Sequence, residues 1–139
     1  MATRLLLRVV TPKQSVLETE VQEVTAPGTV GEFGVLPDHV TFLSSLECGV
    51  LRYRKNQREA AMAIRGGFAE VRDNVMTVLA DEAVSAEEIV VDATRQELAE
   101  AEAALQRAPF GSTEYAQAES EKRWAEARLA ASRARSTPS

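Results

Sequence analysis

A chain of 139 residues, 45% of them apolar, is long enough for one domain with a packed core or for two small domains. Its net charge of -5 argues against a general nucleic-acid binder, which usually carries a basic patch. The single cysteine excludes an internal disulfide, and a chain without disulfides is typical of a reducing compartment. Cys48 is best interpreted as a small buried apolar residue.

The beginning of the chain carries no basic segment followed by an apolar one, so we expect no signal peptide. The apolar run Leu5-Leu6-Leu7 ends at Arg8, far short of the roughly 20 apolar residues that a helix needs to cross a bilayer. We therefore expect a soluble protein that can still dock on a membrane complex.

The first half contains short apolar segments that predict β-strands, because apolar and polar positions alternate and turn-forming residues separate the segments. Asp73-Asn74 suits a two-residue hairpin turn, since both residues tolerate a positive φ. Short strands at this spacing predict a β-sandwich or flattened barrel over residues 1–84. Strands are expected within the segments 5–10, 20–26, 40–42, 51–53, 60–64, 68–72 and 75–80.

The segment from Pro27 to His39 carries three glycines within seven residues, between two prolines. Glycine adopts a positive φ at little steric cost, and Pro37 pushes Leu36 toward an extended conformation. We predict a tight turn at the rim of a sheet, with Glu32 carried outward at its tip. A turn with a purely structural role would explain these residues equally well.

The second half predicts a helical hairpin, because Ala, Glu, Gln and Arg dominate after Val91. Ser85 begins a capping box that ends at Glu88, whereas Asp92 could cap a helix beginning at the next residue. The β-branched pair Val90-Val91 favours Asp92. Residues 85–91 are therefore interpreted as a connector, and residues 92–139 as the hairpin with a short disordered tail.

The two helices are expected to be separated by Pro109-Phe110-Gly111, with Ser112 or Thr113 capping the second helix. Alanine is the commonest residue of their facing stripes, and at about 25 cal/mol per Å² such a seam contributes little. We infer that the hairpin can detach, extend or change partner; a plain two-helix cover over the sandwich is the alternative. The stripe residues are Val91, Leu98, Ala101, Leu105, Ala108, Tyr115, Ala118, Ala125 and Leu129.

Charge differs between the two predicted helices. Residues 86–107 carry six acids and two arginines, and residues 113–135 carry five bases and four acids. The bases lie toward the C-terminal end, where they complement the helix dipole. The second helix is either a solvated face or a basic helix that binds an acidic protein surface.

Sequence patterns for catalysis are missing. His39 is the single histidine, with no cysteine or second histidine at metal-ligand spacing. The chain has no Gly-x-Ser-x-Gly elbow and no phosphate-binding Gly-x-x-x-x-Gly-Lys loop. We expect no catalytic residues, no metal site and no enzymatic activity of the chain itself.

The chain resembles the epsilon subunit of the F-type ATP synthase, in particular its bacterial form, over nearly its whole length. Each matching segment alone would be a weak signal, but together they are specific. The matching segments are Thr11-Pro12, residues 27–39, Gly49-Val50-Leu51-Arg52, Gly66-Gly67-Phe68-Ala69-Glu70-Val71, Val78-Leu79-Ala80-Asp81 and Tyr115-Ala116-Gln117-Ala118.

The resemblance implies an N-terminal β-sandwich, a C-terminal two-helix domain, and a non-catalytic rotor subunit of the central stalk in a proton-translocating synthase. It implies a peripheral position at the cytoplasmic face of the bacterial plasma membrane. The implied partners are the gamma subunit, the c-ring, and the alpha and beta subunits of the catalytic head. The implied contact residues are Gly31, Glu32, Phe33, Gly34 and His39 toward the c-ring and gamma, and Lys122, Arg123 and Arg128 toward the head, where the hairpin would inhibit ATP hydrolysis.

Some relatives bind ATP through an Ile/Leu-Asp-x-x-Arg-Ala motif, which implies a weak regulatory ATP site at Asp92, Arg95 and Arg128 here. Gln96 replaces the alanine, and Glu102 stands where a basic residue is expected. A helix cap with an ordinary surface charge is the alternative interpretation of Asp92 and Arg95. Two other functions stay open: a stand-alone nucleotide sensor, and a generic sandwich that dimerises through residues 92–135.

Overall fold

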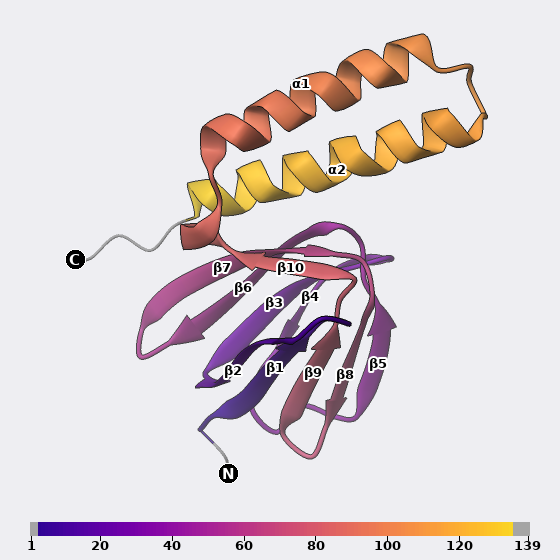
Figure 1. Cartoon of the computed structure of the whole chain (residues 1–139). Helices are drawn as coiled ribbons and strands as arrows, with labels where there is room; N and C mark the ends of the chain where they lie inside the picture. Colours follow the sequence, from indigo (N-terminus) through magenta and orange to yellow (C-terminus); the bar gives the residue numbers. More distant parts are fainter. Residues whose placement is uncertain (1–2, 135–139) are drawn as a thin grey trace.

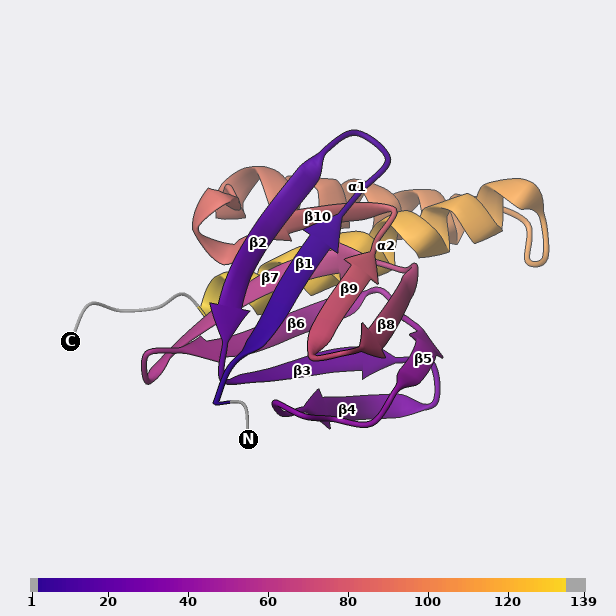
Figure 2. The same ribbon diagram turned by 90° about the horizontal axis from the view of Figure 1, so that it is seen from below.

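The alternating segments of residues 5–85 pair into two five-stranded sheets that face each other (Figures 1 and 2). This computed structural model describes residues 3–134; the tail expected to be disordered lies outside them. The first sheet has the order β2-β1-β9-β8-β5 and the second β10-β7-β6-β3-β4. The strands are β1 (Leu5–Val10), β2 (Ser15–Val21), β3 (Glu23–Gly28), β4 (Gly31–Val35), β5 (Phe42–Ser45), β6 (Gly49–Lys55), β7 (Arg58–Arg65), β8 (Phe68–Arg72), β9 (Val75–Leu79) and β10 (Glu82–Ser85).

The sandwich core lies between the two sheets, as the alternation predicts. Leu5, Leu7 and Val9 of β1 are fully buried, while Arg8 between them is exposed. Side chains at alternate positions of a strand point to opposite faces, so each strand buries one row and leaves the other outside. The inward rows of both sheets form one continuous cluster, which confirms the sandwich part of the predicted fold class.

The turn between β8 and β9 is confirmed as a two-residue hairpin turn. Asp73 and Asn74 have φ angles of 50° and 64°, between the paired residues Arg72 and Val75. Both central residues of such a turn need a positive φ, which Asp and Asn accept more readily than most residues.

Two helices follow the sandwich and run antiparallel to each other (Figure 1). A short 3-10 helix, η1 (Ala86–Glu88), leads into α1 (Val91–Arg107), and α2 (Thr113–Arg133) returns across the outer face of β6 and β7. The predicted cap of the second helix is confirmed, since the Ser112 hydroxyl accepts a hydrogen bond from the Tyr115 amide at 3.1 Å. Within residues 3–134 no helix has both the length and the apolar character that crossing a membrane requires.

The prediction that Asp92 caps the first helix is wrong. The cap position belongs to Val90, which makes no side-chain cap, and the helix begins at Val91. Ile89 is buried against α2, so its packing fixes where the chain leaves the sandwich and overrides the local capping preference. Thr94 then donates a hydrogen bond to the Val90 carbonyl at 2.8 Å within the first turn.

Several strands differ from the sequence expectation, among them β4, whose residues were expected to form a turn. The run expected over 20–26 divides at Gln22, where β2 of one sheet ends and β3 of the other begins. β10 was not predicted, because its short segment becomes a strand only by pairing with the end of β7. β7 is in turn covered on both faces: Ile64 lies in the sandwich core, and Ala63 packs under α2.

Candidate functional site

The hairpin between β3 and β4 forms an exposed tip at the end of the second sheet. Gly28 pairs with Gly31, so Thr29 and Val30 make the turn, and Val30 is 98% exposed. A side chain at position 28 would place its Cβ 2.7 Å from the Gly31 carbonyl oxygen, and Gly31 has a φ of 129°. Glycine at both positions therefore lets the two strands pair up to the turn.

The expectation that Glu32 lies at this tip is wrong, because the ladder continues through Glu32 and pairs it with Pro27. Glu32 is nevertheless 62% exposed, and its carboxylate lies 3.9 Å from the guanidinium of Arg52 on β6. Contacts to the first sheet hold the tip in place, since the Thr29 amide donates to the Ser45 carbonyl at 3.1 Å. The carboxylate is therefore presented beside the tip by a braced hairpin.

The other expected contact residues of this region are spread along β4. Gly31 and Gly34 are exposed, whereas Phe33 is half-buried and meets Phe42 edge to face, with ring centroids 5.0 Å apart. His39 lies beyond the end of β4 and also meets the Phe42 ring edge to face, with ring centroids 5.8 Å apart. Phe33 and His39 are therefore brought together around Phe42.

Asn74 holds the loop before His39. Its amide oxygen accepts from the Asp38 backbone at 2.9 Å, and its amide nitrogen donates to the Arg4 carbonyl at 2.6 Å. Asp38 has a φ of 65°, which an aspartate tolerates when its backbone is held by such a bond. The β8–β9 turn thus fixes the loop that carries His39.

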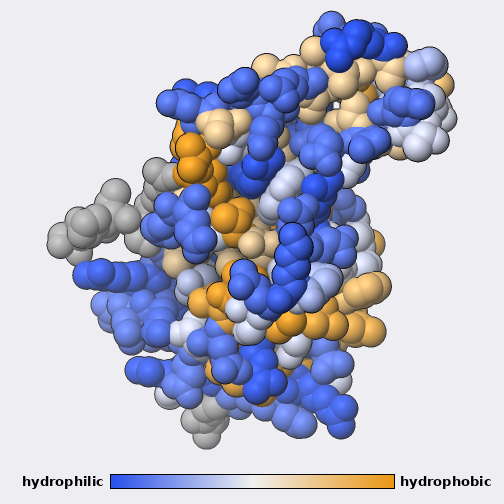
Figure 3. Space-filling view, viewed as in Figure 1, coloured by the Kyte–Doolittle hydropathy of each residue, from blue (hydrophilic) through white to orange (hydrophobic). Residues whose placement is uncertain are grey.

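An apolar surface that sequence reasoning missed lies on the outer face of the first sheet. Phe68 of β8 pairs with Leu79 of β9, and Leu79 pairs with Val10 of β1. Phe68 and Leu79 are more than half exposed, and Leu43 on β5 is 69% exposed. We call Val10, Leu43, Phe68 and Leu79 the outer apolar face; apolar surface over these strands is visible in Figure 3.

The second candidate site lies where α2 meets the sandwich. Arg65, at the end of β7, donates to the Glu82 carboxylate of β10 at 2.8 Å. It also donates to Ser120 at 2.9 Å and to the Glu121 carboxylate at 3.0 Å, both on α2. Burial alone would lower the pKa of Arg65, but its bonds to Glu121 and Glu82 outweigh burial and raise that pKa.

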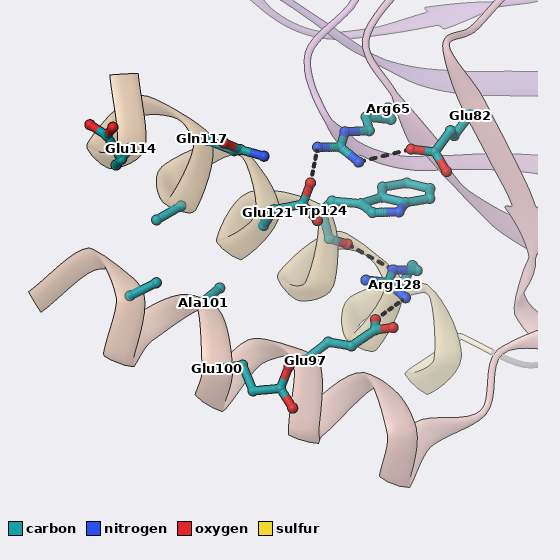
Figure 4. Close-up of a pocket in the computed structure, with 12 residues that line it drawn as sticks. Arg65, Glu82, Glu97, Glu100, Ala101, Glu114, Gln117, Glu121, Trp124 and Arg128 are labelled. Atoms are coloured by element: carbon teal, nitrogen blue, oxygen red, sulfur yellow. Dashed lines mark hydrogen bonds and ion pairs between the residues drawn. The ribbon is translucent and has the colours of Figure 1, made fainter. Parts of the chain in front are cut away.

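Trp124 of α2 lies between two guanidinium groups (Figure 4). The carbon Cζ of Arg65 is 5.9 Å from the centroid of the indole, and that of Arg128 is 5.1 Å away. Arg128 also forms an ion pair with Glu97 of α1, with Nη1 and Oε2 2.6 Å apart. Cations over an indole face are attracted by the ring quadrupole, so both arginines stabilise the same aromatic ring.

These groups border a groove of about 630 Å³ between the helices and the sandwich. Five carboxylates face two guanidinium groups there, so the groove is acidic. A phosphate group would be repelled by this excess of negative charge. The lining residues are Arg65, Glu82, Glu97, Glu100, Ala101, Ala104, Glu114, Gln117, Ala118, Glu121, Trp124 and Arg128.

The three residues expected to hold ATP do not lie together in the structure. Arg128 lines the groove, and Asp92 and Arg95 do not. A helix turns about 100° per residue, so Arg95 leaves α1 on nearly the opposite side from Glu97, which lines the groove. Asp92 and Arg95 are both exposed.

The basic residues expected to meet the catalytic head also have different surroundings. Lys122 is half-buried. Arg123 is 59% exposed, forms an ion pair with Glu119 at 3.6 Å and lines a separate cavity of about 350 Å³. Arg128 is 17% exposed inside the hairpin. With the hairpin docked, Arg123 is therefore the more accessible of these two arginines.

Cys48 lies half-buried beneath α2, in a small cluster with Trp124 and Ala63. Burial raises the pKa of its thiol from an ordinary value of 9.0 to about 11, against the opposing effect of nearby Arg65, Arg123 and Arg128. The thiol is therefore neutral near pH 7 and packs as a small apolar group.

Comparisons with known proteins place the chain in a family. Residues 4–86 match the family described as the ATP synthase delta/epsilon chain, beta-sandwich domain. This chain belongs to that family. The match confirms the resemblance drawn from the sequence, and it covers the sandwich that carries both the braced tip and the outer apolar face.

Relatives of this family member extend the similarity beyond the sandwich. The ATP synthase epsilon chain of Nitratidesulfovibrio vulgaris is 50% identical over 90 residues, covering 65% of this chain and 67% of the relative. The ATP synthase epsilon chain of Geobacter sulfurreducens is 43% identical over 107 residues, covering 77% of this chain and 78% of the relative.

Solved structures share the fold. A chain of the Euglena gracilis mitochondrial ATP synthase, in a structure of OSCP, F1 and c-ring, has a TM-score of 0.82 and 28% identity over 94% of this chain and 82% of that one. A chain from the central stalk and c-ring of the Tetrahymena thermophila mitochondrial enzyme has a TM-score of 0.59 and 16% identity, over 91% of this chain and 95% of that one. At this identity the similarity shows the fold alone.

Proposed function

We propose that this chain is a non-catalytic rotor subunit of the central stalk of a proton-translocating F-type ATP synthase. In this proposal the sandwich links the c-ring to the gamma subunit, and the hairpin inhibits ATP hydrolysis by the alpha and beta subunits of the catalytic head. The protein then lies peripherally at the cytoplasmic face of the bacterial plasma membrane. Membership of the ATP synthase delta/epsilon family supports this assignment.

The main support for a contact with gamma is the outer apolar face. A monomeric protein rarely keeps aromatic and aliphatic side chains exposed in adjacent rows of one sheet unless another protein covers them. Phe68 and Leu79 form such a row, on the opposite sheet from the one that α2 covers. Gamma could thus occupy this face without displacing the hairpin.

The braced tip supports the c-ring contact. Val30 and the carboxylate of Glu32 project there from a hairpin that is tied to the neighbouring sheet, so the tip can transmit force. A carboxylate suits contact with basic loops of a partner. If Glu32 serves this contact, Glu32→Lys should lower proton-driven ATP synthesis in membrane vesicles, and Glu32→Gln should lower it less.

The decisive experiment adds the chain to a catalytic head stripped of this subunit and measures both gamma binding and ATP hydrolysis. We expect the full chain to bind and inhibit, and a truncation ending at Val90 to bind without inhibiting. Phe68→Glu should weaken gamma binding by about tenfold or more, as for a central interface anchor. Arg72→Glu, on the same strand and face, is the matched control.

Failure of the full chain to bind gamma would overturn the proposal. Binding of both the full chain and the truncation with no change in hydrolysis would leave the rotor role and remove the inhibitory one. Equal loss of binding in the Phe68 and Arg72 variants would contradict the assignment of Phe68 as the anchor of the gamma contact.

A further inference from the structure

The contact between α2 and the sandwich depends on few apolar side chains. Its apolar cluster is centred on Trp124 and otherwise consists of Ile89, three alanines and three partly buried residues in or next to the second sheet. Alanine buries little area, so this cluster alone holds the helix weakly. The polar contacts beside it therefore have an unusually large share in keeping the hairpin docked.

Those polar contacts converge on Arg65. One guanidinium reaches Glu82 of β10 and Glu121 of α2, and it lies over the indole of Trp124. The Arg65 side chain is 23% exposed, so these interactions are partly shielded from solvent screening. A single residue of the sandwich thus holds the middle of α2 by both ion pairing and a cation–π contact.

The same ring connects Arg65 to the far helix. Arg128 lies over Trp124 and is paired with Glu97 of α1. Glu82, Arg65, Trp124, Arg128 and Glu97 therefore form a continuous series of contacts from β10 to α1, visible in Figure 4. We call these five residues the latch.

We propose that the latch sets the balance between a docked and a released hairpin, with Arg65 as the positioning residue. Moving α2 off the sandwich breaks the contacts of Arg65 with Glu121 and Trp124 together, so release is cooperative. Release also uncovers Cys48. The latch is a property of the chain by itself; its use in controlling hydrolysis rests on the proposed function.

One consequence concerns partners. While the hairpin is docked, Trp124 is 6% exposed and Arg128 is held by Glu97, so neither offers a free surface. An acidic partner surface can bind Arg128 only by displacing Glu97. Because the latch is held by charge, salt favours release, whereas a purely apolar contact would tighten as salt rises.

Cys48 is a natural reporter of release, because it is the single cysteine and lies beneath α2. We would measure its rate of reaction with a disulfide reagent at pH 8 in the full chain and in Arg65→Gln. Arg65 lowers the pKa of this thiol, so losing its charge without release would slow the reaction. An acceleration therefore reports release and not electrostatics.

We expect Arg65→Gln to react about fivefold to tenfold faster than the parent chain. Arg65→Lys should lie between them, since lysine keeps the charge but not the several donors by which the guanidinium reaches Glu82, Ser120 and Glu121 together. Raising the salt concentration should accelerate the parent more than Arg65→Gln. Arg72→Gln removes a charge from a strand of the other sheet and should match the parent.

Trp124, the single tryptophan, supplies a second readout. Its fluorescence should shift to longer wavelength and be quenched more readily by acrylamide in Arg65→Gln, while circular dichroism shows that sheets and helices persist. Unchanged labelling and quenching in Arg65→Gln would overturn the latch, as would equal acceleration in Arg72→Gln. Release of the hairpin without any effect on hydrolysis in the reassembled head would overturn the inhibitory role and leave the latch standing.

Discussion

Arg128 Nη1 lies 2.6 Å from Glu97 Oε2, and this ion pair joins the two helices of the hairpin. The acidic first helix and the basic end of the second, which the sequence shows as separate charge runs, are thus complementary within one molecule. Arg128 is 17% exposed and Glu97 54%, so only the arginine is well shielded. A pair of this kind contributes more than an open surface pair and less than a buried one.

Glu97→Gln and Arg128→Gln should each lower the free energy of unfolding, and together less than the sum of the two. A double-mutant cycle by urea unfolding should give a coupling of about 0.5–1 kcal/mol. The exposed Glu119–Arg123 pair is the matched control and should give about 0.3 kcal/mol. Equal couplings for the two pairs would contradict the role assigned to Arg128.

Asn74 should be needed for two separate reasons, its positive φ and its two side-chain hydrogen bonds. Asn74→Gly keeps the backbone conformation and loses the bonds, so it should destabilise the protein by about 1–2 kcal/mol. Asn74→Ala loses both and should cost about 1 kcal/mol more. Thermal unfolding of the two variants beside the parent checks the order; a glycine variant as stable as the parent would remove the role of the bonds.

Cys48 should make the protein less stable at alkaline pH. Its pKa is raised by burial to about 11 in the folded chain, so the unfolded chain loses the thiol proton first as pH rises. Stability from the neutral thiol is present below about pH 9 and is lost between about pH 9 and pH 11. Urea midpoints at pH 7 and pH 10.5 should differ less in Cys48→Ala than in the parent.

Tyr53, whose pKa is also raised by burial and by Glu87, contributes to the same alkaline loss in both proteins and cancels in that comparison. The same pH dependence in Cys48→Ala and the parent would show that the thiol is not buried in solution.

Mg-ATP should bind no more tightly than high-micromolar affinity, as measured by isothermal titration. Arg128 is engaged by Glu97, and the groove that it lines is acidic, so phosphate groups meet repulsion there. Glu97→Gln should raise the affinity because it removes one negative charge and frees Arg128. Low-micromolar binding by the parent chain would contradict this assignment.

Local patterns predicted the parts of the fold that neighbouring residues decide. Alternation predicted which side chains of β1 and β8 are buried. Asp73-Asn74 predicted a hairpin turn, and Ser112 predicted a helix cap. Each depends on backbone preferences or on hydrogen bonds spanning a few residues, so the sequence carries the signal directly.

Tertiary contacts overrode local preference at three places. Ile89 packs under α2 and moves the start of α1 ahead of Asp92. Pairing with Pro27 draws Glu32 into a strand and leaves Val30 at the tip. β10 exists because the end of β7 offers an edge to pair with. None of these follows from the residues on either side.

The sequence by itself determined the two-part architecture, the weak alanine seam and the charges available on each helix. Only the tertiary structure decided which charges meet and which apolar row faces solvent. Arg65 and Glu121 are 56 positions apart, and their pairing requires that α2 fold back onto β7. Contacts of that separation depend on the packing of the whole chain, whereas periodicity and turn residues report only what is nearby.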